Sequence, residues 1–166
     1  SFRPNPQNVS KFYDAGVRLF SVLTSGVTSA LGVPYSLYGE SWVGENTYDF
    51  SAIDRQMDMF IENAPEAYFA PMIQLDTRDW YLSHHQGIPN SFTHLSQIAC
   101  DEEWKNAASD YMKAAILPIE EKYGDKVRTF CMNPKGSVVN ENTNGIITVN
   151  GHSYEDPAKQ TENTNF

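Results

Sequence analysis

The sequence predicts an α/β fold in which helices alternate with the parallel strands of one sheet. Three short apolar runs, each of the length of a buried strand, begin at Val17, Ala67 and Val127, and a helical pattern precedes each of them. Strands that alternate with helices are joined by crossover connections, which make neighbouring strands parallel. Long segments follow the first two runs, and loops at this end of a parallel sheet carry binding sites.

Length and charge narrow the class of protein. The chain has 166 residues, and its 12 basic and 21 acidic side chains give a net charge of -9. This acidic balance argues against a nucleic-acid-binding surface, and no apolar run of about 18 residues predicts a membrane helix. The chain starts at Ser1 without an apolar leader segment, so we expect a piece processed or excised from something longer.

The first helix and strand are predicted from their boundary residues. Asn5 is expected to be the N-cap, Pro6 the first helical residue and Gly16 the stop. The apolar face of this helix comprises Val9, Phe12 and Tyr13. Residues 17–23 follow as a mostly apolar run, which predicts a buried strand.

A long loop over residues 24–47 leads to the second helix, and long loops in compact domains are usually functional. Ser51 and Asp54 form a capping-box-like pattern at the start of this helix, with Asp where Glu is usual. Its apolar stripe comprises Ile53, Met57, Phe60 and Ile61. Pro65 bars continuation of the helix.

The second strand is predicted over residues 67–75, although Pro71 would remove one hydrogen-bond donor from the ladder. A second long loop is expected over residues 76–100. Asp101 caps the third helix, in which Pro118 should kink or shorten the last turns. The apolar face of this helix comprises Trp104, Ala108, Tyr111 and Ala115. A third short strand is predicted over residues 127–132.

Composition changes after Met132, which divides the chain into an α/β part at residues 1–132 and an Asn-rich tail at residues 133–166. In the tail, Val138-Val139 and the run 146–149 could pair around Asn144-Gly145. This pattern predicts a small hairpin or a loosely held tail.

Aromatic and acidic side chains gather just past the predicted strand ends. Trp42 and Trp80 lie in the two long loops, and Asp76 and Asp79 lie close to Trp80 in sequence. The apolar face of a sugar ring stacks on an indole, and carboxylates accept its hydroxyl protons, so this combination suits carbohydrate recognition. The alternative is that the tryptophans only pack the loops onto the domain.

Other chemistries have weaker support. His84-His85, His94 and Cys100 match no recognised metal-ligand spacing, so we expect no metal. The chain has no Gly-x-Ser-x-Gly elbow and no glycine-rich phosphate loop, so neither a serine hydrolase triad nor a nucleotide cofactor is expected. Cys100 and Cys131 either pair or stay free as small buried side chains.

Four stretches, in this order and spacing, carry a family resemblance: residues 15–20, the Trp42 loop running into 48–54, residues 75–82, and residues 123–127. Together they resemble the N-terminal half of glycoside hydrolases with a (β/α)₈ barrel, of the β-galactosidase-like kind. In that family a Trp loop precedes a Tyr-Asp-Phe-Ser helix start, and a later strand ends in an Asp-Thr-x-x-Trp segment at the sugar site. The resemblance covers about residues 5–132 and implies a partial (β/α)₈ (TIM) barrel.

The resemblance also implies a reaction. Such enzymes retain configuration and use two carboxylates, an acid/base glutamate after the fourth strand and a nucleophile near the seventh. If the strand ending at Met132 is counted as the fourth, Glu141 is the nearby candidate for the catalytic acid/base. The nucleophile would lie beyond Phe166, and the partners would be a carbohydrate substrate and the rest of a longer polypeptide, or a second copy, completing the barrel. Substrate binding would involve Trp42, Asp76, Asp79 and Trp80.

Two other interpretations stay open. A non-catalytic carbohydrate-binding or assembly module built on a half barrel would use the same aromatic residues without hydrolysis. A small-molecule enzyme on a flavodoxin-like open sheet would need a ligand loop where the strand order reverses, and no specific residues support it.

Overall fold

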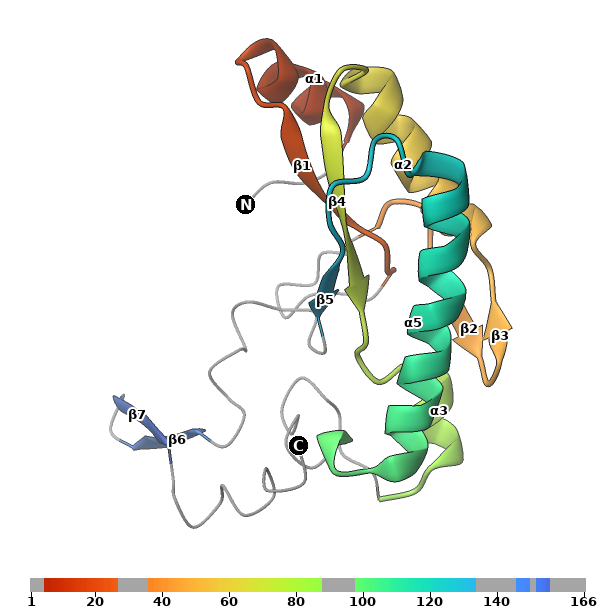
Figure 1. Cartoon of the computed structure of the whole chain (residues 1–166). Helices are drawn as coiled ribbons and strands as arrows, with labels where there is room; N and C mark the ends of the chain where they lie inside the picture. The colour runs from red at the N-terminus through yellow and green to blue at the C-terminus, as the bar shows by residue number, and fades with distance from the viewer. Residues whose placement is uncertain (1–4, 27–35, 88–97, 134–145, 150–151, 156–166) are drawn as a thin grey trace.

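The computed structural model describes residues 5–26, 36–87, 98–133, 146–149 and 152–155. Its main sheet has three parallel strands in the order β1 (Leu19–Leu23), β4 (Tyr68–Gln74) and β5 (Cys131–Asn133) (Figure 1). Helix α2 (Ser51–Asn63) connects the first pair, and α5 (Glu102–Tyr123) lies in the second connection. The predicted α/β fold with alternating helices and parallel strands is therefore confirmed.

The first helix begins and ends where the sequence predicts. Helix α1 spans Pro6–Asp14, and the Asn5 side chain accepts a hydrogen bond from the Asn8 amide at 2.9 Å. The chain leaves this helix through Gly16, whose φ of 96° lies in the left-handed region that favours glycine.

Helix α2 buries the predicted apolar stripe but begins differently. Ile53, Met57 and Phe60 are almost completely buried. The predicted capping box, however, does not form, because Ser51 is already the first helical residue and the N-cap is Phe50, which has no polar side chain. Instead the Asp49 carboxylate accepts hydrogen bonds from the Ser51 amide at 3.0 Å and from its hydroxyl at 2.6 Å.

Helix α5 is longer than predicted. Asp101 caps it as expected, accepting from the Trp104 amide at 2.7 Å, but the helix continues through Pro118 to Tyr123. A proline removes one helical hydrogen bond and does not prevent tertiary contacts from stabilising the next turn. Here the Tyr123 hydroxyl reaches carboxylates of α2, at 3.0 Å from Asp54 and 2.9 Å from Asp58.

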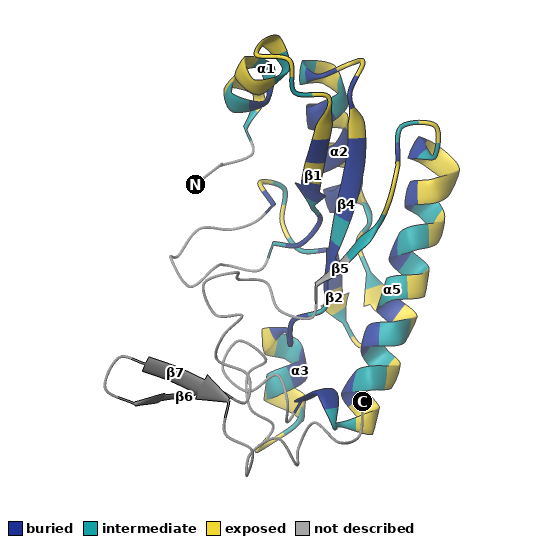
Figure 2. Cartoon of the chain, turned by 60° about the vertical axis from the view of Figure 1, so that its left-hand side comes forward, coloured by how far each residue is buried: buried dark blue, intermediate teal, exposed yellow. Residues whose placement is uncertain are grey.

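Both helices pack on the same face of the sheet, and the core lies between them and the strands (Figure 2). Phe20, Phe60 and Phe69 meet edge-on or tilted, with ring centroids 5.9 to 6.4 Å apart. The other face is open at its amino end, where the paired residues Leu19 and Tyr68 are 56% and 40% exposed.

Pro71 lies in the central strand β4, opposite the point where the neighbouring segment does not pair with β4 before β5 begins. Amides of β4 alternate between the two neighbours: that of Tyr68 donates toward β1 at 2.8 Å, and that of Phe69 donates toward β5 at 2.9 Å. By this alternation the missing N–H of Pro71 faces β5. The neighbouring chain pairs with β4 at Val127 and then only from Cys131, so the strand predicted over 127–132 is interrupted.

The two predicted long loops contain regular structure. Strands β2 (Trp42–Gly44) and β3 (Thr47–Tyr48) form a hairpin within and just after the first loop, with Asn46 at a positive φ of 49° in its turn. Helix α3 (Asp79–His84) occupies part of the second loop. Both elements are short and lie among polar residues, so neither shows an apolar pattern long enough to be recognised in the sequence.

The tail hairpin forms between later residues than the sequence predicts. Strand β6 (Ile146–Val149) pairs with β7 (His152–Glu155), so the loop between them holds Asn150-Gly151 rather than Asn144-Gly145. Both dipeptides are typical of hairpin turns. The expected partner Val138-Val139 lies outside the described residues. Neither Cys100 nor Cys131 forms a disulfide bond.

Candidate functional site

A buried charged network lies where β1 and β4 end. The Arg78 guanidinium donates to the Ser25 hydroxyl at 3.2 Å, to the backbone oxygen of Gln74 at 3.0 Å, and to the backbone oxygen of Asp76. It also forms an ion pair with Glu40 at 3.2 Å. Arg78 is buried, so these contacts take the place of its hydration.

Glu40 connects Arg78 to the start of the β2–β3 hairpin. One of its carboxylate oxygens accepts from the amides of Ser41 and Trp42 at 2.9 and 3.0 Å, and the other accepts from the Ser25 hydroxyl at 2.7 Å. Charge-assisted hydrogen bonds of this kind are the stronger ones. Arg78 and Glu40 therefore fix strand β2 to the carboxyl end of the sheet.

Trp42 occupies the centre of an aromatic cluster. Its indole stacks on Tyr111 with centroids 4.7 Å apart and an angle of 8°, and it meets Trp80 edge-on at 5.5 Å. The Tyr111 hydroxyl lies 2.6 Å from the Ser41 hydroxyl, and burial raises the pKa of Tyr111. Because Trp42 is only 1% exposed, its ring supports Trp80 and is covered by protein.

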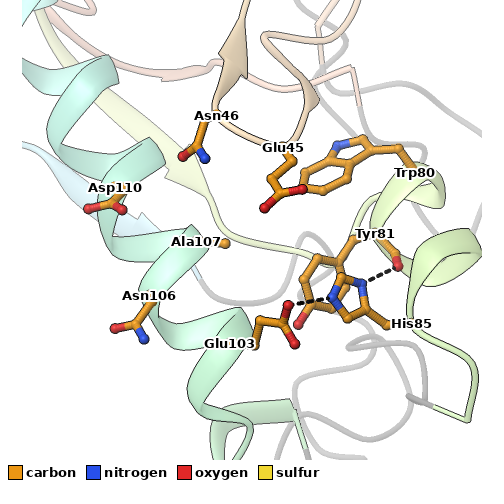
Figure 3. A pocket seen from close by; sticks show the side chains of 9 residues that line it. All are labelled: Glu45, Asn46, Trp80, Tyr81, His85, Glu103, Asn106, Ala107 and Asp110. Carbon is orange, nitrogen blue, oxygen red and sulfur yellow. Dashed lines mark hydrogen bonds and ion pairs between the residues drawn. The ribbon is translucent and has the colours of Figure 1, made fainter.

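A pocket of about 170 Å³ opens beside this cluster (Figure 3). Its walls come from the hairpin turn, helix α3 and the first half of α5. The lining residues are Glu45, Asn46, Trp80, Tyr81, His85, Glu103, Asn106, Ala107 and Asp110. The indole N–H of Trp80 donates to the backbone oxygen of Trp42 at 3.1 Å, which fixes the half-buried ring at the pocket edge.

His85 closes the pocket between α3 and α5. Its ring stacks on Tyr81 with centroids 3.9 Å apart, Nδ1 lies 2.8 Å from the Tyr81 backbone oxygen, and Nε2 lies 3.1 Å from the Glu103 carboxylate. The hydrogen bond to Glu103, more than any other contact, raises the pKa of His85 above its ordinary value. The pocket therefore places a titratable imidazole among carboxylates.

Tyr81 ties helix α3 to the cap of α5. Its hydroxyl donates to the Asp101 carboxylate at 3.0 Å, and the same carboxylate oxygen accepts from the Trp104 amide at the N-terminus of α5. Burial and the acidic neighbour raise the pKa of Tyr81. The stacked pair of Tyr81 and His85 thus stands on a fixed base.

The residues predicted from the sequence lie in different environments. Trp80 lines the pocket, whereas Trp42 and Asp76 are buried and do not line it. Asp79 is exposed at the start of α3. Glu141 lies outside the described residues.

The sequence prediction missed the α5 wall of the pocket. Glu103, Asn106, Ala107 and Asp110 have the spacing i, i+3, i+4, i+7, which places them on one helical face. This spacing could have revealed the wall, although acidic helix positions are usually solvated. Arg78 and Glu40 were also missed, because their pairing depends on a contact between two distant loops.

Among the described residues, no group of three or more His, Cys, Asp or Glu side chains is placed to hold a metal ion. The same part of the chain contains no helix long and apolar enough to cross a membrane. Comparison of the chain with protein-family models, curated proteins and solved structures finds no match.

Proposed function

We propose that this chain is the N-terminal part of a glycoside hydrolase barrel and binds carbohydrate at the carboxyl ends of its strands. The observation that carries the proposal is the pocket beside Trp80. It combines a half-buried indole with carboxylates and amides, the groups that sugar recognition requires.

The arrangement of helices supports the barrel. Strands β1, β4 and β5 follow one another across the sheet in chain order, and α2 and α5 cover the same face. In a (β/α)₈ barrel the chain winds in one direction with all helices outside. In a doubly wound sheet the strand order reverses and helices cover both faces.

The pocket offers complementary contacts for a pyranose. The free edge and face of Trp80 can pack against the apolar C–H groups of the ring. The carboxylates of Glu45 and Asp110 can accept hydrogen bonds from hydroxyls, while the amides of Asn46 and Asn106 can both donate and accept. Trp42 and Arg78 act as positioning residues, since they hold the hairpin and Trp80.

Hydrolysis would require two further carboxylates. Glu141 is the proposed acid/base, protonating the leaving oxygen and later activating water, and the nucleophile would come from a later strand of the barrel. In the full polypeptide that contains this later strand, Glu141→Gln should then abolish most turnover of aryl glycosides and leave sugar binding intact. Glu162→Gln, in the same tail, is the matched control and should have no effect.

The binding proposal is tested by titrating a panel of methyl glycosides into the protein and recording chemical shifts or heat. Trp80→Ala should weaken binding by about two- to twelvefold, because one stacked aromatic face contributes about 0.5–1.5 kcal/mol. Trp80→Phe should retain part of the affinity, and Phe12→Ala, an exposed aromatic at a distance, should retain all of it. Unchanged binding by Trp80→Ala would overturn the proposal.

A non-catalytic assembly module is the second candidate, and the edge of β1 favours it. Phe12, Val17, Leu19, Phe20 and Ser21 line an open apolar groove there. In a barrel this edge is covered by a further parallel strand, from the same polypeptide or a second copy.

The native mass of the chain in solution separates these cases. A mass of twice 18.7 kDa that returns to 18.7 kDa in Leu19→Lys would support assembly of two copies through the β1 edge. Sugar binding without turnover of any aryl glycoside by the full polypeptide would favour the module over the enzyme.

A further inference from the structure

The contacts of His85 define its charge state. Nδ1 faces a backbone carbonyl oxygen at 2.8 Å, and Nε2 faces a carboxylate oxygen of Glu103 at 3.1 Å. A carbonyl and an ionised carboxylate only accept hydrogen bonds. Both contacts are satisfied at once only when both ring nitrogens donate, and a histidine that donates from both is an imidazolium.

Loss of one proton breaks this arrangement. A neutral imidazole has one donor and one lone pair, so either Glu103 or the Tyr81 carbonyl then faces a lone pair. The backbone contact lies within α3, whereas the Glu103 contact joins α3 to α5 (Figure 3). Glu103 is 71% exposed, so its side chain can turn into solvent when this contact is lost, while the Tyr81–Asp101 hydrogen bond still holds α3 to the cap of α5.

Acidic side chains lie around His85 on two of the three elements that surround it. Helix α5 and its cap contribute Glu103 and Asp101, the hairpin turn contributes Glu45, and α3 contributes the Tyr81 ring and carbonyl. Of the nine described residues that line the pocket, His85 alone carries a positive charge. Deprotonation would leave Glu45, Glu103 and Asp110 without a cation among them.

We propose that His85 is a pH-dependent latch: protonated, it bridges α3 to α5 and keeps the pocket formed, and deprotonated, it releases Glu103 and lets the pocket widen. As a control on sugar affinity this rests on the proposed function. As a conformational change of the pocket it does not.

Histidine titration by ¹⁵N–¹H NMR tests the charge state directly. His85 should titrate above the ordinary value of a free histidine, about 6.5. Glu103→Gln should lower the His85 midpoint, because it removes the carboxylate partner. If His85 titrates at or below the ordinary value, or if Glu103→Gln leaves its midpoint unchanged, the latch is excluded.

Tryptophan fluorescence tests the opening. Trp42 and Trp104 are buried, so acrylamide quenching reports mainly on Trp80 at the pocket edge. Quenching should increase as the pH rises through the His85 midpoint. His84→Gln should preserve this step, and His85→Arg, which keeps the charge but does not titrate, should abolish it. A step that persists in His85→Arg would overturn the proposal.

Sugar titrations separate the two proposals. If a methyl glycoside binds, its affinity should fall by about fivefold or more across the same pH step, the lower end of typical coupling between sites. Binding that does not change with pH would overturn the latch as a control of affinity. If no glycoside binds but the quenching step is present, the proposed function fails and the latch stands.

Discussion

Two ion pairs flank the Trp42–Trp80 contact. Their lengths are nearly equal, but their residue types and their burial differ. Arg78 and Glu40 are 3.2 Å apart, with side chains 4% and 24% exposed. His85 and Glu103 are 3.1 Å apart, with side chains 22% and 71% exposed. Removing one member of the first pair leaves the other charge largely buried. In the second pair, water can solvate the remaining member at little cost.

The comparison shows how neighbouring charges take different roles. Arg78 is always protonated and is surrounded by four acceptor groups, so it fixes the carboxyl end of the sheet at every physiological pH. His85 changes charge near neutral pH and is partly solvated, so it can respond to its environment. The fixed pair supports Trp42, and the titratable pair closes the pocket.

The largest effect is expected for Arg78→Met. It should lower the free energy of unfolding by about 3 kcal/mol, because Glu40 is left without its cation and the backbone oxygens of Gln74 and Asp76 lose their donor. Arg78→Lys should recover only part of the loss, since an ammonium cannot reproduce the forked contacts. Urea unfolding measures both, and a loss below about 1 kcal/mol for Arg78→Met would contradict the assigned role.

An intermediate effect is expected for Tyr111→Phe. The substitution keeps the stack on Trp42 but removes the 2.6 Å hydrogen bond to Ser41, which should cost about 1 kcal/mol. Tyr68→Phe, at an exposed ring on β4, is the control and should leave stability within about 0.5 kcal/mol of the parent. Equal stabilities of the two variants would show that this hydrogen bond adds nothing.

The smallest effect is expected for His85→Gln. The pKa of His85 is raised in the folded protein, so its ion pair stabilises the fold at low pH, and this contribution is lost as the pH rises through the folded-state midpoint. At pH 6 the free energy of unfolding of the parent should exceed that of the variant by about 0.5 kcal/mol, and the two values should converge at higher pH. A difference that grows with pH would contradict this sign.

Local signals in the sequence predicted most of the fold. Asn5, Pro6 and Gly16 bound the first helix, and the stripe of Ile53, Met57 and Phe60 marked the buried face of the second. These features depend on residues close together in the chain. For the same reason the parallel strands could be located from their apolar runs.

The features that were missed depend on distant contacts. Helix α5 passes Pro118 because Tyr123 reaches α2, and the break before β5 reflects Pro71 in a strand far away in sequence. For the site, Trp80 was predicted from its place near acidic residues and lies at the pocket edge, but Glu103 and His85 meet only once α3 packs against α5. No local pattern distinguishes such a glutamate from a solvated one.

Pro71 also sets how the sheet comes apart. The β1–β4 ladder runs without interruption from Leu19 to Leu23, whereas β5 joins β4 only beyond the proline. The two ladders therefore need not open together. Amides shared by β1 and β4 should exchange with solvent only on global unfolding, while the β5 side should exchange through smaller local openings. A single residue without an N–H thus divides one sheet into two cooperative units.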